Sequence, residues 1–166
     1  MMKQKASIDA SFWINACVSN IIHFVPEYFI PVVPSVVAAE VRYPLDVLGI
    51  EANTAVLFNQ WLDSGRITLS DPEKPVDWFH KGENAAIALA IEQNCFLLID
   101  DANPYHRAKS AGLNVVGTSE LIILLYDHGR ISHEQAQNAL QLIHASKKQK
   151  RTALTTLEVL VRKKGT

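Results

Sequence analysis

The sequence predicts an α/β domain built around a mainly parallel β-sheet, and three observations support this fold class. Short apolar segments alternate with longer segments of helical spacing, which is the order of elements in βαβ units. Residues Cys95–Ile99 form an unbroken apolar run, as expected of a parallel strand buried on both faces. A chain of 166 residues with 48% hydrophobic residues is large and apolar enough for one domain with a proper core.

Five segments are expected to form strands, since each is short and apolar and is followed by turn-forming or helical sequence. In chain order they are Ala6–Ala10, Phe29–Val33, Ile67–Leu69, Cys95–Ile99 and Asn114–Val116, the third being minor. Pro31 has no backbone N–H to donate, so it indicates an edge or an irregular end in the second strand.

Helices are expected between the strands and after the last one, where apolar residues recur at helical spacing. They are Ser11–Asn20, Ser35–Arg42, Glu51–Asp63, Gly82–Gln93, Asn103–Ala111, Ser119–Asp127, Ser132–Ser146 and Thr152–Lys164. Pro44 is expected to stop the second helix. The basic run Lys147–Arg151 is the one expected hinge, which divides the chain into a domain at residues 1–146 and a basic helical tail at residues 147–166.

The net charge of −1 hides a strong asymmetry. Residues 147–166 hold seven Lys and Arg against Glu158 alone, a charge of +6, while the rest of the chain carries −7. The basic tail is either a solvated helix end or an arm that contacts phosphates, because an acidic body needs cations to meet RNA. Its apolar stripe either packs inside the molecule or is covered by a partner, and the first of these is the commoner arrangement for such stripes. The stripe consists of Leu154, Leu157, Leu160 and Val161.

Several functional classes have little support in the sequence. Cys17 and Cys95 lie far apart without a CxxC motif, so we expect two buried free thiols in a reducing compartment. The six histidines contain no HxxxH pair that would suggest zinc. Residues 1–9 lack the apolar run of a signal peptide, and no stretch is long and apolar enough to span a membrane. We therefore expect a soluble cytoplasmic protein.

Carboxylates follow the predicted strands at the edge where ligands bind in open parallel sheets. Asp9 ends the first strand, Asp100 and Asp101 follow the fourth, and the hydroxyl of Thr118 follows the fifth. Each acid alone has an ordinary explanation as a helix cap or a turn residue. Together they would repel one another unless a cation lay among them.

Two helical glutamates extend this acidic set. Glu40 shares a helix face with Val36 and Val37, and a carboxylate on an apolar face is costly unless it is paired or coordinates a metal. A salt bridge to an arginine would also account for it. Glu83 opens the helix at Gly82–Gln93, where a negative charge also suits the helix dipole without any functional role.

The order and spacing of these residues resemble those of PIN domains, and most closely the VapC-type toxins of toxin–antitoxin systems, which share the Gly-Glu helix opening and the paired Asp. The resemblance extends over about residues 6–129. The matching segments are Ile8-Asp9-Ala10-Ser11, Val33–Glu40, Gly82–Ala90, Leu98-Ile99-Asp100-Asp101 and Val115-Val116-Gly117-Thr118.

This resemblance implies a three-layer α/β/α fold and a metal-dependent endoribonuclease, the toxin partner of an antitoxin and a homodimer. In the family, strand-end and helical acids hold Mg²⁺ or Mn²⁺, and a hydroxyl residue helps to hold the catalytic water. By position the acids are Asp9, Glu40, Glu83 and Asp101, with Asp100 adjacent, and the hydroxyl residue is Thr118. Two features depart from the family pattern. The third acid is Glu rather than the commoner Asp. The segment Pro72–Lys81, which contains Trp78, Phe79 and His80, is unusually aromatic and has no assigned role.

Three other classes of protein compete with this hypothesis. Receiver-type and haloacid-type phosphotransfer domains need an acidic motif at the first strand, which here offers only Asp9. A dinucleotide enzyme would need a GxGxxG motif after that strand, which is absent. A PIN-fold RNA-binding or interaction module without catalysis remains the main alternative.

Overall fold

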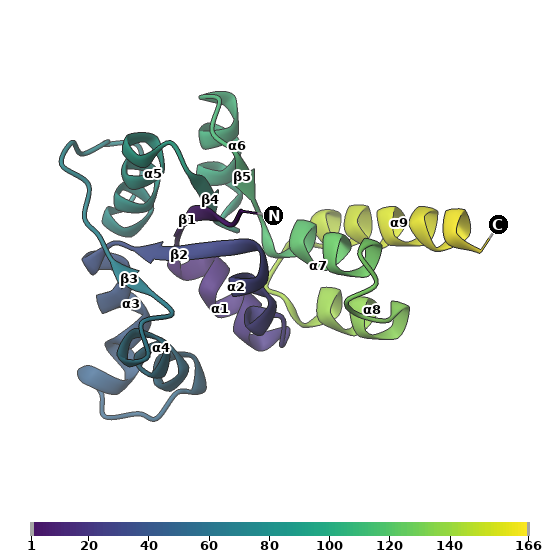
Figure 1. Ribbon diagram of the computed structural model, residues 1–166, viewed down its shortest axis with the longest axis horizontal. Helices are drawn as coiled ribbons and strands as arrows, with labels where there is room; N and C mark the ends of the chain where they lie inside the picture. The colour runs from purple at the N-terminus through teal and green to yellow at the C-terminus, as the bar shows by residue number, and fades with distance from the viewer. Residues whose placement is uncertain (1, 166) are drawn as a thin grey trace.

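A computed structural model describes residues 2–165 and confirms the α/β class, with a fully parallel five-stranded sheet in this part of the chain (Figure 1). The strand order is β3-β2-β1-β4-β5. Its strands are β1 (Gln4–Ile8), β2 (Phe29–Val33), β3 (Thr68–Leu69), β4 (Phe96–Leu98) and β5 (Val115–Val116). Because β1 lies between β2 and β4, the chain winds outward from the middle of the sheet in both directions. The register pairs Ile8 with Leu98, so β1 and β4 end side by side.

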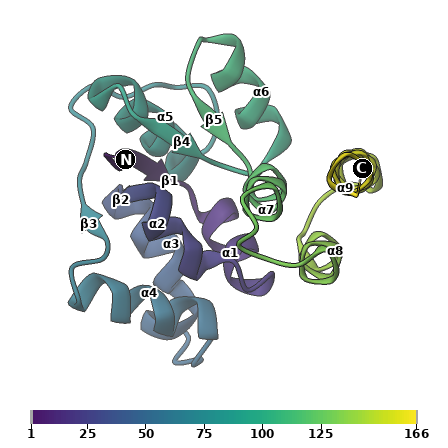
Figure 2. The same ribbon diagram turned by 45° about the vertical axis from the view of Figure 1, so that its right-hand side comes forward.

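Helices cover both faces of the sheet, as expected for right-handed crossovers that wind outward in two directions. Figures 1 and 2 show α5 and α6 on one side and α1, α3 and α4 on the other. These helices are α1 (Ala10–Val18), α3 (Ser35–Asp46), α4 (Asn53–Asp63), α5 (Lys81–Gln93) and α6 (Ala102–Ser110). Between β1 and β2 lie two short helical turns that the sequence did not predict, η1 (Ile22–Phe24) and α2 (Val25–Tyr28).

The last three helices pack against one another at one side of the sheet (Figures 1 and 2). They are α7 (Thr118–Asp127), α8 (His133–Leu142) and α9 (Lys147–Lys164). Leu157 of α9 is fully buried, and Leu154 and Val161 pack against the core. Three of the four residues in the apolar stripe of the basic tail are therefore packed within the molecule, where α9 lies against α7 and α8, and Leu160 is half-buried.

The expected hinge at Lys147–Arg151 is wrong, because these residues form the first turns of α9. Ser146 caps the helix by accepting a hydrogen bond from the backbone N–H of Gln149, at 3.2 Å. The predicted helix Ser132–Ser146 is too long for a related reason. It ends at Leu142, since Ile143 is extended and the N–H of His144 donates to the Asn15 side chain instead of to a helical carbonyl.

Two expectations about prolines are corrected. Helix α3 runs through Pro44 to Asp46; the carbonyl of Glu40 loses its usual donor there, which the last turn of a helix tolerates better than its middle. Pro31 lies in an inner strand and not at the edge. Strand β3 pairs only with Val32 and Val33, so Pro31 precedes the part of β2 that is paired on both sides.

The cysteines are free thiols, as expected, but they are half-buried instead of fully buried. Partial burial raises the pKa of Cys17 to about 12, so this thiol stays protonated and unreactive at neutral pH. No helix within residues 2–165 is long and apolar enough to cross a membrane.

Candidate active site

Asp9 lies where the strand order reverses, between the carboxyl ends of β1 and β4, the crevice in which open α/β sheets bind ligands. Its backbone N–H donates to the carbonyl of Leu98 at 3.0 Å, which ties the two strand ends together. Asp9 is also the N-cap of α1, so the structural role and the proposed metal-binding role fall on the same residue. With only 2% of its surface exposed, its carboxylate depends on its neighbours for polar partners.

Ser11 provides those partners and holds the second acidic strand end in place. The Ser11 hydroxyl donates to Asp9 Oδ2 at 2.7 Å, and the Ser11 backbone N–H donates to the same oxygen at 3.1 Å. The hydroxyl oxygen in turn accepts from the backbone N–H of Asp100 at 3.0 Å and that of Asp101 at 3.4 Å. One side chain therefore positions the carboxylate after β1 relative to the acidic pair after β4.

Glu40 reaches this edge from α3, and its carboxylate lies against Gly82 at the start of α5. A Cβ at position 82 would stand 2.5 Å from Glu40 Oε1, which is closer than real contacts allow. Glu40 is exposed and does not lie in the apolar core, although Val37 one turn earlier is buried. No Arg or Lys of residues 2–165 lies within ion-pair distance of it, so the salt-bridge explanation is wrong for the described chain.

Glu83 and Asp101 face a small cavity of about 440 Å³ that Phe79 and His80 also line. One oxygen of Glu83 accepts from the backbone N–H of His80 at 2.9 Å, so Glu83 caps α5 and faces the acidic edge at once. The aromatic segment that had no assigned role thus forms a wall of the site. Asn84 holds it there: its Oδ1 accepts from the N–H groups of Trp78 and Phe79 at 3.0 and 2.7 Å.

Electrostatics link the four carboxylates that were predicted to form one site. Burial raises the pKa of Asp9 above its ordinary value, and the nearby charge of Asp101 raises it further. Desolvation raises the pKa of Glu40, and so do the charges of Asp9, Glu83 and Asp101. The pKa of Glu83 is raised by burial, by the charges of Asp9 and Asp101, and by a hydrogen-bonding contact with the Asp101 carboxyl. The structure therefore brings these acids into mutual repulsion at the carboxyl edge of the sheet.

Asp100 and Thr118 lie beside this group but belong to a second network. Thr118 is fully buried, and its N–H and hydroxyl both donate to the Asp100 carboxylate at 2.6 Å. Asn15 Nδ2 donates to the same carboxylate at 2.5 Å. Burial is the largest influence on Asp100 and raises its pKa, although these hydrogen bonds act in the opposite direction. Hydrogen bonds from Thr118 and Asn15 therefore fix the Asp100 carboxylate. The Thr118 hydroxyl points to Asp100 and not to the four-acid group.

Two residues of the site, Ser11 and Asn15, were not found from the sequence. Both lie on α1, one turn apart, and Asn15 is buried with 4% of its surface exposed. Beyond its bond to Asp100, the Asn15 side chain pairs with the backbone of His144, accepting from its N–H at 2.8 Å and donating to its carbonyl at 3.2 Å. In the sequence, Asn15 could have been recognised as the one amide in an otherwise apolar helix that directly follows the strand-end Asp9.

The donor set suits a hard divalent cation, because it consists of carboxylate oxygens whose repulsion such an ion would relieve. The absence of a side chain at Gly82 also leaves the space that the Glu40 carboxylate fills. As the side chains lie, no three His, Cys, Asp or Glu residues among those described enclose an ion. Asp9 and Glu83 direct oxygens to Ser11 and to the His80 N–H, so these are the side chains that would adjust to a metal.

Comparisons with known proteins give a family match over most of the chain. The sequence profile of family DUF3368, described as a PIN domain, matches residues 8–164. A solved PilT N-terminus domain protein of the archaeon Sulfolobus solfataricus P2 is 18% identical and aligns over 85% of this chain and 98% of its own, with a TM-score of 0.43. No curated protein gives a significant match.

Proposed function

Since the chain belongs to the PIN-domain family DUF3368, and PIN domains are generally nucleases, we propose that it is a metal-dependent endoribonuclease. The observation that carries this proposal is the group of four mutually repelling carboxylates at the switch point of the sheet, Asp9, Glu40, Glu83 and Asp101. Such a group destabilises a folded protein unless a cation offsets the repulsion between the carboxylates.

Asp9 and Asp101 would be the principal ligands of Mg²⁺ or Mn²⁺, and Glu40 and Glu83 would complete the site or orient waters. When bound, the metal supplies an activated water and neutralises charge on the phosphodiester. Ser11 holds Asp9 and the backbone at Asp100 and Asp101 in a fixed relation. Phe79 and His80 line the small cavity beside Glu83.

The test is cleavage of a labelled single-stranded RNA by the purified protein with Mg²⁺ or Mn²⁺, and its loss in excess EDTA. Asp9→Asn should lower the rate by orders of magnitude, because a hard cation needs the anionic oxygen. The fold should survive, since Asn also caps helices.

Asp71→Asn is the matched control for this change. Asp71 accepts from the N–H and the hydroxyl of Ser35, both at 2.7 Å, just as Asp9 accepts from those of Ser11, but it lies outside the acidic group. The Asp71→Asn variant should cleave the labelled RNA at the wild-type rate. Wild-type cleavage by Asp9→Asn would contradict the proposed metal site at Asp9. A wild type that binds RNA without cutting it would instead favour the catalytically silent binding module.

We further propose that this nuclease is the toxin of a toxin–antitoxin pair and forms a homodimer. The support is the sequence resemblance together with an exposed apolar surface that a partner would cover, formed by the end of α3 and the loop after it. Its residues are at least half exposed: Tyr43, Val47, Leu48 and Ile50. A small DNA-binding protein encoded beside this gene that suppresses cleavage, and a dimeric mass in solution, are the expected results.

A further inference from the structure

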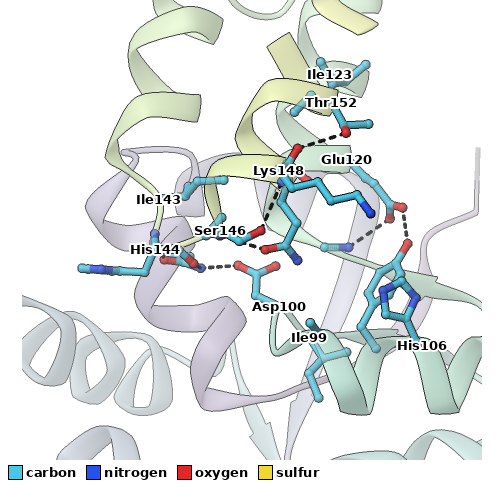
Figure 3. A pocket seen from close by; sticks show the side chains of 18 of the residues that line it. Ile99, Asp100, His106, Glu120, Ile123, Ile143, His144, Ser146, Lys148 and Thr152 are labelled. Carbon is cyan, nitrogen blue, oxygen red and sulfur yellow. Dashed lines mark hydrogen bonds between the residues drawn. The ribbon is translucent and has the colours of Figure 1, made fainter. Parts of the chain in front are cut away.

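A cavity of about 730 Å³ adjoins the acidic group and has no part in the chemistry proposed above (Figure 3). It lies between the end of β4, helices α6 and α7, and the first turns of α9. The segment Asp100–Ala102 contributes to the lining of both this cavity and the smaller hollow of Glu83 and Asp101. Asp100 lines the large cavity, Asp101 lines the small one, and Ala102 lines both. A linear molecule bound at the acidic group could therefore extend over this segment toward the large cavity.

The floor of this cavity is fixed by buried hydrogen bonds. Asn15 joins the carboxylate of Asp100 to the backbone of His144, in the connection between α8 and α9. Thr118 holds the same carboxylate from the start of α7. The cavity is consequently anchored to the strand end that carries the acidic pair, so the two sites have a fixed spacing.

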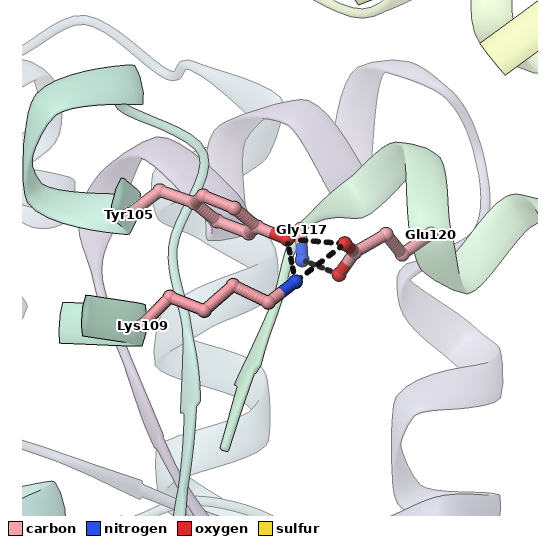
Figure 4. A network of polar contacts seen from close by, with 4 residues as sticks. All are labelled: Tyr105, Lys109, Gly117 and Glu120. Atoms are coloured by element: carbon pink, nitrogen blue, oxygen red, sulfur yellow. Dashed lines mark hydrogen bonds and ion pairs between the residues drawn. The ribbon is translucent and has the colours of Figure 1, made fainter. Parts of the chain in front are cut away.

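One wall presents an aromatic ring in a fixed position. The Tyr105 hydroxyl donates to the Glu120 carboxylate and accepts from Lys109 Nζ at 2.8 Å (Figure 4). Lys109 also forms an ion pair with Glu120 at 3.6 Å, and the N–H of Gly117 donates to Glu120 at 3.0 Å. These contacts fix the hydroxyl end of the side chain, and Lys109 Nζ also lies over the ring, 5.0 Å from its centroid. Tyr105 lines the cavity, so the part of the ring that faces it offers a planar group an aromatic contact.

The remaining walls combine apolar surface with a few polar groups, as is typical of small-molecule sites. Ile99, Ile123 and Ile143 supply the apolar part, and Gln149 and Thr152 of α9 supply polar atoms. Lys148 also lines the cavity, and no carboxylate of residues 2–165 lies within ion-pair distance of its ammonium group. A ligand with a planar base and an anionic linkage fits this combination.

We infer that the cavity binds one nucleotide of a single-stranded RNA next to the bond cut at the acidic group. Its base stacks against Tyr105 and the isoleucine wall, and its phosphate faces Lys148. This inference rests on the proposed nuclease function and adds the part of the protein that selects the sequence around the cut. It also assigns a role to the basic start of α9.

The test fills the cavity from α9 and compares a matched position on the same helix. Thr152 lines the cavity and Thr155 does not, yet both are exposed, and each hydroxyl donates at 3.0 Å to the carbonyl four residues earlier. Binding of a fluorescent single-stranded RNA is measured in EDTA, where no cleavage occurs, for Thr152→Trp and Thr155→Trp. A second pair, Lys148→Ala and Lys147→Ala, compares a cavity lysine with its exposed neighbour.

Thr152→Trp should weaken RNA binding at least about tenfold, because stacking alone is worth about 1–3 kcal/mol per base. Lys148→Ala should weaken binding severalfold. Both control variants should bind RNA like the wild type. With metal, Thr152→Trp should also change which sequences are cut in a randomised RNA. Equal binding by all variants, or equal losses at Thr152 and Thr155, would overturn the inference even if cleavage persists. Because binding is read without metal, a wild type that binds but does not cleave overturns only the nuclease proposal.

Discussion

Gly82 shows how the absence of a side chain can determine the position of a neighbouring carboxylate. The Glu40 carboxylate occupies the space that any side chain at position 82 would need, with Glu40 Oε1 only 2.5 Å from the position of a Cβ. The Gly-Glu pair that opens α5 therefore has two separate roles. The glycine admits a carboxylate from α3, and the following Glu83 contributes its own.

Gly82→Ala is expected to displace the Glu40 carboxylate while leaving the fold intact, because the group that must move is the far end of a flexible side chain. Cleavage should fall by about tenfold or more, within the range seen when a group that orients metal ligands is lost. The free energy of unfolding should change by less than about 1 kcal/mol, since Ala favours helix.

A double-mutant cycle identifies the cause of this loss. If the added methyl group acts through Glu40, then Glu40→Gln should reduce cleavage, and Gly82→Ala should cost almost nothing further in that background. Additive losses in the double variant would show that Gly82 acts by another route.

At the scale of elements, α9 is the part of the chain whose role changed most between sequence and structure. Composition indicated a basic tail behind a hinge, but the helix begins at Lys147 and buries Leu157 completely against α7 and α8. Its first turns also close the large cavity. We therefore expect α9 to contribute to the stability of the whole domain.

Leu157→Ala tests this contribution and should lower the free energy of unfolding by about 2–5 kcal/mol, the usual cost of a large-to-small change in a core. Val159→Ala on the same helix is the control, because Val159 is 46% exposed and its truncation should cost less than about 0.5 kcal/mol. Urea denaturation followed by circular dichroism measures both. If the tail were independent of the domain, both variants would show small and similar losses in the free energy of unfolding.

At the scale of the whole molecule, the acidic group connects stability to pH and to metal. The pKa values of Asp9, Glu40 and Glu83 are raised, so the folded protein keeps these protons to higher pH than the unfolded chain does. Their contribution to stability is thus most favourable below the ordinary carboxyl pKa of about 4, and it is lost as pH rises through the raised values.

In EDTA, Glu40→Gln should therefore be more stable than the wild type at pH 7, and this advantage should vanish near pH 4. Adding Mg²⁺ or Mn²⁺ at pH 7 should raise the Tm of the wild type. At a metal concentration of 100 times Kd, the free energy of unfolding should increase by about 2.7 kcal/mol. The rise should be smaller at pH 4.5, because protons compete for the ligands. Asp71→Asn should keep the metal-induced rise. A wild-type Tm that is unaffected by millimolar metal would count against the metal site.

Much of the fold was determined by patterns that lie close together in the sequence. Strand β2 was predicted to the residue, and the apolar run at Cys95–Ile99 contains β4, because the apolar pattern of a segment reflects its burial. The strand-end acids followed from the same reasoning, since the carboxyl ends of parallel strands share one edge. The order of these motifs was also enough to indicate the family.

Only the tertiary structure decided which groups meet across long separations in the chain. It turned the Thr118 hydroxyl toward Asp100, 18 residues earlier, and joined Asn15 to the backbone of His144, 129 residues later. It also made Lys147–Arg151 the beginning of a packed helix and brought that helix over a cavity beside the acidic group. Periodicity and composition describe how each segment divides between core and solvent, whereas these contacts depend on how whole elements pack, which no local pattern contains.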